Sequence, residues 1–99
     1  MSKLFPAALA VLVSLPVLAD DAAVAARYAK TCAICHTNGV ANAPRTGDAD
    51  AWQERMTKGM DALLASVRNG LSSMPPKGMC FDCTDADFAA LIDYMAKAK

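Results

Sequence analysis

The only histidine of the chain stands directly after a pair of closely spaced cysteines, in the pentapeptide Cys32-Ala33-Ile34-Cys35-His36. Two intervening residues let a curled backbone bring both thiols to the same edge of a flat group. The next side chain then lies beneath the centre of that group. This is the attachment pattern of c-type haem. The sequence therefore predicts one covalent haem c, with Cys32 and Cys35 as its anchors and His36 as an iron ligand.

A second pair of cysteines, Cys80 and Cys83, leaves other interpretations of the thiols open. The two pairs together could form a four-thiolate zinc site, although the gap between them is longer than in common zinc ribbons. Zinc also has no use for His36 directly after a ligating pair. A thioredoxin-like redox pair requires a βαβ setting, which the pattern lacks. A plain structural disulfide between Cys32 and Cys35 leaves the histidine unexplained.

An apolar run over residues 4–18 follows a short basic start at the N-terminus. Val17 and Ala19 place small residues at both positions that a signal peptidase reads. A membrane anchor is the alternative, but the run is shorter than the roughly 20 residues that span a bilayer, and two prolines interrupt it. We expect a signal peptide at residues 1–19 and a domain at residues 20–99, soluble in the periplasm or an equivalent exported compartment, where cysteines are oxidised.

Cleavage would leave 80 of the 99 residues, and a domain of that size has a marginal core that often needs a disulfide, a metal or a cofactor. Large rings are few in this part of the chain. A bound haem would supply the missing apolar centre. The formal net charge of zero gives no basic surface for nucleic acid.

The apolar spacing predicts an all-α domain of about four helices joined by irregular loops, with no strand. The expected helices run over residues 22–31, from Asp48 or Asp50 to a break at Gly59, over residues 61–69, and from a cap at Thr84 onward. Asp87 falls at the capping-box position of the last helix. Four apolar residues at helical spacing give that helix the clearest stripe of the chain: Phe88, Leu91, Ile92 and Met95.

The loop at residues 74–78 (Met-Pro-Pro-Lys-Gly) supplies the candidate ligand for the opposite face of the iron. Pro75 favours an extended Met74, and the two prolines stiffen the loop, so a thioether is presented at low entropic cost. Methionine is an established partner of histidine on haem iron. Met60 and Met79 stay open as alternatives to Met74.

Residues 28–94 resemble class I c-type cytochromes, and most closely the small bacterial cytochrome c5 group. The resemblance rests on the pentapeptide at residues 32–36, on Asn-Ala-Pro at residues 42–44, on the loop at residues 74–78, and on the helical segment at residues 91–95. It implies a small class I cytochrome c fold around the haem. One departure is Val24, where the family often has a glycine at the crossing of the first and last helices.

The resemblance also implies roles for single residues. The carbonyl of Pro44 accepts the ring N–H of His36 and so fixes the tautomer. Cys80 and Cys83 form the extra disulfide of the c5 group, with a pair of free thiols as the alternative. Trp52 is similar to the aromatic residue that the family places near the haem propionates. The alternative interpretation, nearly as well supported, is a tryptophan that only packs in the core. Three cations could pair with the propionates or remain solvated surface charges: Arg45, Arg55 and Lys77.

An iron held by His36 and Met74 has no open position, so the chemistry left is one-electron outer-sphere transfer through the haem edge. We predict an electron carrier rather than an enzyme, with no small-molecule substrate and no nucleic-acid partner. Its partners would be redox proteins, a reductase and a terminal oxidase or reductase, with transient docking to membrane complexes. Two alternatives stay open: a haem sensor or small-ligand enzyme with an open sixth position, and a zinc-stabilised structural module.

Overall fold

The computed structural model describes residues 21–97, and the predicted signal peptide at residues 1–19 lies outside the described residues. Within this part the fold is all-α, as predicted. The helices are α1 (Asp21–Lys30), α2 (Ala33–His36), α3 (Ala49–Met56), α4 (Met60–Asn69) and α5 (Asp85–Lys97). Two short 3-10 helices, η1 (Val40–Asn42) and η2 (Pro76–Met79), lie in the expected loops. The described residues contain no strand beyond an isolated bridge between Leu71 and Met74.

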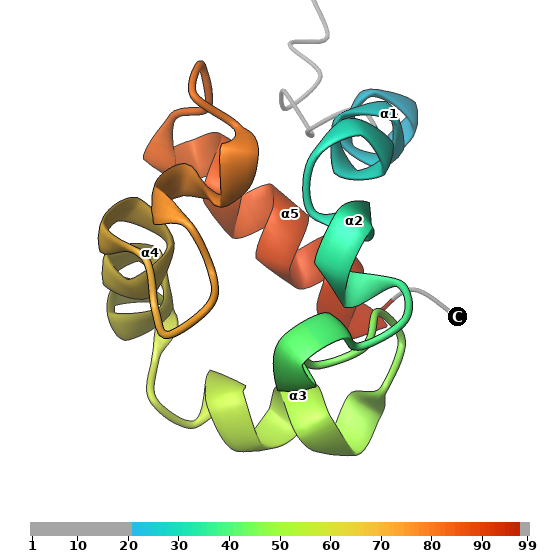
Figure 1. The fold of residues 1–99 in the computed structure, drawn as a ribbon, viewed down its shortest axis with the longest axis vertical. Helices are drawn as coiled ribbons and strands as arrows, with labels where there is room; N and C mark the ends of the chain where they lie inside the picture. The colour runs from blue at the N-terminus through green and yellow to red at the C-terminus, as the bar shows by residue number, and fades with distance from the viewer. Residues whose placement is uncertain (1–20, 98–99) are drawn as a thin grey trace, which may run out of the picture.

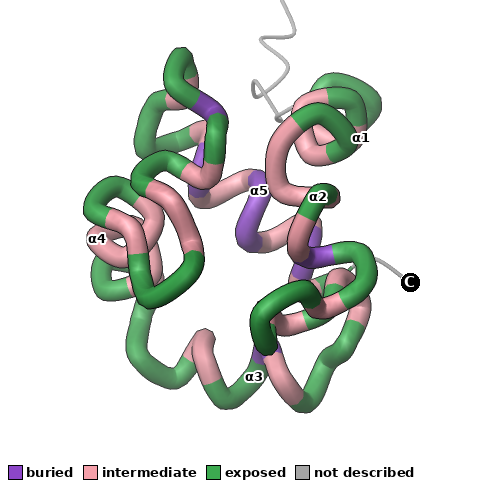
Figure 2. The backbone as a smooth tube through the Cα atoms, in the orientation of Figure 1, coloured by how far each residue is buried: buried purple, intermediate pink, exposed green. Residues whose placement is uncertain are grey.

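Helix α5 is the centre of the fold (Figure 1), and it contacts α1, α3 and α4. Its predicted apolar stripe is confirmed, because the four residues of the stripe are all buried: Phe88, Leu91, Ile92 and Met95. Figure 2 shows the buried backbone concentrated along this helix. Residues at i, i+3, i+4 and i+7 share one helical face. The other three helices therefore pack against this buried face of α5.

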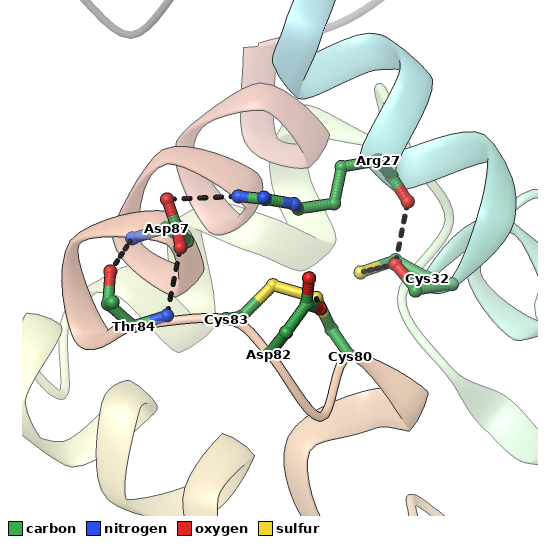
Figure 3. Close-up of a disulfide and its surroundings, with 8 residues drawn as sticks. Arg27, Cys32, Cys80, Asp82, Cys83, Thr84 and Asp87 are labelled. Carbon is green, nitrogen blue, oxygen red and sulfur yellow. Dashed lines mark hydrogen bonds and ion pairs between the residues drawn. A yellow bond between two sulfur atoms is a disulfide. The ribbon is translucent and has the colours of Figure 1, made fainter.

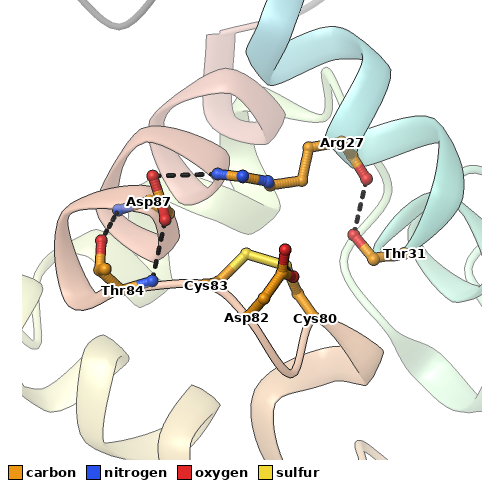
Figure 4. A network of polar contacts seen from close by, with 7 residues as sticks. All are labelled: Arg27, Thr31, Cys80, Asp82, Cys83, Thr84 and Asp87. Carbon is orange, nitrogen blue, oxygen red and sulfur yellow. Dashed lines mark hydrogen bonds and ion pairs between the residues drawn. A yellow bond between two sulfur atoms is a disulfide. The ribbon is translucent and has the colours of Figure 1, made fainter.

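The start of α5 carries the predicted capping box, with aspartate in place of the usual glutamate (Figure 4). The Thr84 backbone N–H donates to Asp87 Oδ2 at 2.9 Å, and the Asp87 N–H donates to Thr84 Oγ1 at 3.2 Å. Asp87 also pairs with Arg27 Nη1 at 3.0 Å, which ties α1 to this cap. The cap therefore fixes both the beginning of α5 and its contact with α1.

The other helix boundaries lie close to the predicted ones. Asp48, not Asp50, caps α3, since its Oδ1 accepts from the Ala51 N–H at 3.2 Å. Helix α4 begins one residue early, at Met60, and Gly70 ends it with a φ of +84°. Val24 packs against the buried cluster of α5, so the side chain that replaces the family's glycine is accommodated where α1 meets α5.

The sequence patterns predicted the end of α1 but not the short helix α2. The backbone turns after Lys30, and one helical turn at Ala33–His36 follows, closed by a bond from the His36 N–H to the Cys32 carbonyl at 2.9 Å. This turn carries most of the pentapeptide. No helix within residues 21–97 has the length and hydropathy to cross a bilayer.

Candidate haem-binding site

Two adjoining hollows, of about 490 Å³ and about 110 Å³, form one cleft beside α2 and the loop that precedes α5. Five residues line both hollows and so mark their junction: His36, Pro44, Arg55, Leu71 and Met74. Cys32 and Cys35 line the larger hollow, and Trp52 lines the smaller one. The structure therefore brings six predicted site residues to one cleft: Cys32, Cys35, His36, Pro44, Trp52 and Met74.

The turn of α2 presents both anchor cysteines to the larger hollow. Cys32 and Cys35 are half-buried, and neither is in a disulfide. Burial raises the pKa of the Cys32 thiol, and a hydrogen bond from Thr31 Oγ1 to Cys32 Sγ at 3.5 Å partly offsets this. Cys32 is consequently held as a neutral thiol in an apolar wall.

His36 is fixed in the wall of the cleft with one ring nitrogen engaged. His36 is 8% exposed, and its Nδ1 lies 2.8 Å from the Pro44 carbonyl oxygen. A carbonyl can only accept, so Nδ1 carries a hydrogen, and in the neutral imidazole Nε2 then has the lone pair. The Thr46 backbone N–H donates to the His36 carbonyl at 2.8 Å, which holds the segment after Pro44 against α2. This is the arrangement of a histidine prepared to bind a metal through Nε2.

Met74 is positioned by a small closed loop at the end of α4. Its backbone N–H donates to the Leu71 carbonyl at 2.9 Å, and its carbonyl accepts from the Leu71 N–H at 3.1 Å. A side chain at Gly70 would lie 2.9 Å from the Met74 carbonyl, so the close approach requires glycine there. Met74 lines both hollows, while Met79 lines only the larger one. Met60 lines neither hollow and packs with the cluster of Trp52.

Trp52 lines the smaller hollow, but its indole N–H has a hydrogen-bond partner in the chain. The side chain is 5% exposed, and Nε1–H donates to the Arg45 carbonyl at 2.9 Å. Its ring centroid lies 5.6 Å from that of His36. Trp52 thus packs as a core residue beside His36, and its N–H donates to a backbone carbonyl rather than to a carboxylate.

Of the three cations considered from the sequence, the structure brings only Arg55 to the cleft. Arg55 lines both hollows, and Arg45 and Lys77 line neither. Sequence reasoning missed Lys58, which lines the smaller hollow with Arg55. The signal was available in the sequence, since Lys58 follows Arg55 by three residues, just beyond the end of α3 at Met56.

Cys80 and Cys83 are joined by a disulfide with a Cα–Cα distance of 5.4 Å (Figure 3). Within residues 21–97, Cys80, Asp82 and Cys83 form the only group of three or more His, Cys, Asp or Glu residues whose ligand atoms all lie within 4.8 Å of one another. Cys32 and Cys35 are not part of that group. The four cysteines are therefore not assembled as a zinc site.

The donor set of the cleft fits a c-type haem. Two uncombined thiols lie on one wall beside an imidazole with a free Nε2, and a thioether lines the same hollow. Much of the remaining lining is apolar, and a cation lies where the two hollows meet. Such a set suits a flat apolar group that bears carboxylates and binds iron between nitrogen and sulfur.

Comparison with known proteins agrees with this chemistry. The family model described as cytochrome c oxidase, cbb3-type, subunit III matches residues 19–95. Cytochrome c5 of Azotobacter vinelandii is 47% identical over 70 residues, which cover 69% of this chain and 84% of the relative.

Two solved structures have the same fold. The mono-haem ferrocytochrome c of Shewanella putrefaciens is 50% identical, with a TM-score of 0.68 over 77% of this chain and 94% of that chain. A chain from the crystal structure of an electron-transfer complex of nitrite reductase with cytochrome c is 42% identical. Its TM-score is also 0.68, over 78% of this chain and 93% of that chain.

Proposed function

The chain belongs to the class I monohaem c-type cytochromes, which carry electrons and are not enzymes, and from this membership we propose that it is an exported carrier whose haem iron is bound by His36 and Met74. Haem c supplies a one-electron couple when it is bound. The observation that carries the proposal is the cleft itself, which His36 and Met74 both line while Nδ1 of His36 is held by the Pro44 carbonyl.

The chain's own residues keep both ligands in place during electron transfer. Pro44 restrains the tautomer and the ring of His36, and the paired backbones of Leu71 and Met74 hold the main chain that presents the thioether. Ligands held in this way change little between the two oxidation states, so reorganisation is small. A thioether also favours the reduced state, which raises the potential above that of a bis-histidine site.

Arg55 and Lys58 would hold the carboxylate edge of the haem at the smaller hollow. Both cations line that hollow, and the anchors Cys32 and Cys35 lie in the larger one. The flat group would thereby be oriented by thiols at one edge and cations at another. Arg55 Nη1 also donates to the Ala51 carbonyl at 2.8 Å, which restrains the guanidinium before it meets a carboxylate.

Electrons would pass to and from redox proteins at the mouth of the larger hollow. Four large apolar side chains line that hollow and are at least half exposed: Ile34 (64%), Val40 (50%), Leu71 (57%) and Met79 (51%). A small apolar face suits brief redox encounters, which bury little area. The similar cytochrome c that was crystallised with nitrite reductase supports a protein partner of the reductase or oxidase class.

The proposed location is the exported compartment, with residues 1–19 removed and residues 20–99 forming the mature domain. Export fits the disulfide between Cys80 and Cys83, because such bonds persist in oxidising compartments.

The test is spectroscopy of protein made in an exporting, haem-maturing host. We expect one covalent haem in the pyridine haemochrome spectrum, a mass without residues 1–19, and a near-infrared thioether band in the oxidised protein. Met74→Leu should abolish that band, because it removes the axial sulfur.

Met79→Leu is the matched control, since Met79 lines the larger hollow and the variant should keep the band. Loss of the band in Met79→Leu alone would reassign the ligand. Rapid binding of carbon monoxide to the reduced wild-type protein would contradict a closed site and favour a sensor or small-ligand enzyme.

A further inference from the structure

The disulfide between Cys80 and Cys83 fastens the end of the loop that carries Met74. Cys80 directly follows η2 (Pro76–Met79), and its N–H donates to the Lys77 carbonyl at 2.9 Å. Cys80 is 3% exposed and packs with Phe88 and Leu91 of α5. The disulfide thus joins the last residue of the loop to the segment that enters α5.

The loop needs such a fastening because its backbone is strained. Three of its residues other than glycine have left-handed φ values: Ser72 (+52°), Lys77 (+63°) and Met79 (+69°). Residues with a Cβ hold this conformation only where the surroundings impose it. At one end, Leu71 and Met74 pair their backbones, and at the other end the disulfide holds Cys80 in the core.

The disulfide also shares a buried cluster with Cys32, one of the two proposed haem anchors. Cys32 and Cys83 pack against the same buried cluster as Cys80. Figure 3 shows Cys32 across from the disulfide, on the chain segment that follows α1. A change at this disulfide would therefore be transmitted both to the Met74 loop and to one of the thioether anchors.

The two cysteines of the disulfide differ in burial. Cys80 is buried, whereas Cys83 is half-buried and the residues between them lie in solvent, with Phe81 69% exposed. A thiolate approaching from solvent meets Cys83 first, and the exposed ring of Phe81 offers an apolar contact beside it. The buried Cys80 sulfur is then the leaving group.

We propose that Cys80–Cys83 is a thiol–disulfide exchange site for a dithiol reductant, and that its reduction frees Met74 from the iron, an inference that rests on the proposed ligation. The dithiol attacks Cys83, the Cys80 thiolate leaves and takes up a proton, and the second thiol of the reductant releases Cys83. Two electrons and two protons pass to the cysteines, and the reductant becomes a disulfide. Met74 would then no longer cover the iron of a bound haem.

The expected size of the effect follows from the length of the closed loop. In the chain-entropy model, release of so short a cross-link changes an opening equilibrium roughly 20-fold. Carbon monoxide binds the reduced haem only when Met74 has left, so its binding rate reports that opening. We expect a rate roughly 20-fold higher when the two thiols are free.

The experiment compares two samples of the mature haem protein, both with reduced iron. One is treated with dithionite alone, and the other with dithiothreitol under argon followed by dithionite. Alkylation and mass spectrometry of quenched portions count the free thiols, and stopped-flow mixing measures carbon monoxide binding. Faster binding in the sample with two free thiols supports the proposal. An unchanged rate in that sample overturns it, as does a disulfide that dithiothreitol reduces only after denaturation.

Two further measurements separate this inference from the function on which it rests. A near-infrared thioether band that is absent from untreated oxidised protein would overturn the His36 and Met74 ligation, and this inference with it. The double variant Cys80→Ala/Cys83→Ala should weaken that band and bind carbon monoxide rapidly without any reductant for thiols. If the variant keeps a full band and slow binding, the inference fails while the ligation stands.

Discussion

At the scale of single residues, the cleft distinguishes groups that the sequence leaves equivalent. Arg55 and Lys77 carry the same charge, yet only Arg55 lines the hollows. The difference arises because α3 directs Arg55 to the interior of the cleft, while Lys77 lies in η2 outside its lining. A positive charge near a redox centre stabilises the reduced state, and it does so more strongly when the charge is shielded from water.

The substitution Arg55→Gln should therefore lower the reduction potential. Loss of one nearby cation disfavours the added electron by roughly 1 kcal/mol, which is about 40 mV for a one-electron couple. Spectroelectrochemical titration measures the shift. Lys77→Gln removes the same charge outside the cleft and should change the potential much less, so equal shifts in the two variants would refute the assignment of Arg55.

At the scale of elements, the cap of α5 controls the helix on which the core is built. Substituting Thr84 by alanine removes one partner of the box and should lower the free energy of unfolding by about 1 kcal/mol. Urea unfolding of the haem protein measures this change. Thr57→Ala is a matched control, since its hydroxyl bonds only the Glu54 carbonyl at the end of α3. A larger loss in the control would contradict the importance of the cap.

The same cap predicts a pH dependence. The pKa of Asp87 is lowered from 3.8, first by the hydrogen bond from the Thr84 backbone and further by the Arg27 charge. A depressed folded-state pKa means that the carboxylate stabilises the fold above pH 3.8 and loses this effect as the pH falls through the folded value. Asp87→Asn should thus be less stable than wild type near neutral pH, and the difference should shrink in acid. A constant difference across pH would refute this origin.

Local patterns predicted most elements but not the junctions between them. The stripe on α5 and the caps at Asp48 and Thr84 follow from spacing and hydrogen-bond chemistry within a few residues. The separate turn α2 does not, because a helix of four residues without a side-chain cap is too short to show a periodic pattern. Likewise, the bond from Trp52 to the Arg45 carbonyl depends on how a loop packs against α3.

At the scale of the whole molecule, the protein portion alone has little to hold it together. Six apolar residues of the described part are buried, and they form two small clusters along α5: Trp52, Cys80, Phe88, Leu91, Ile92 and Met95. Between α2 and the Met74 loop lies a hollow of about 490 Å³. A domain with such a core depends on the group that fills the space.

Blocking haem attachment should therefore remove cooperative folding. We expect the variant Cys32→Ala/Cys35→Ala, isolated without haem, to show no sharp thermal transition by circular dichroism and poor dispersion of amide proton signals. The haem protein should unfold in one cooperative step. The disulfide between Cys80 and Cys83 is present in both proteins, so its cross-link cannot account for the difference. A haem-free variant with a native-like transition would show that the two clusters on α5 suffice, and that the cofactor is carried by the fold rather than required for it.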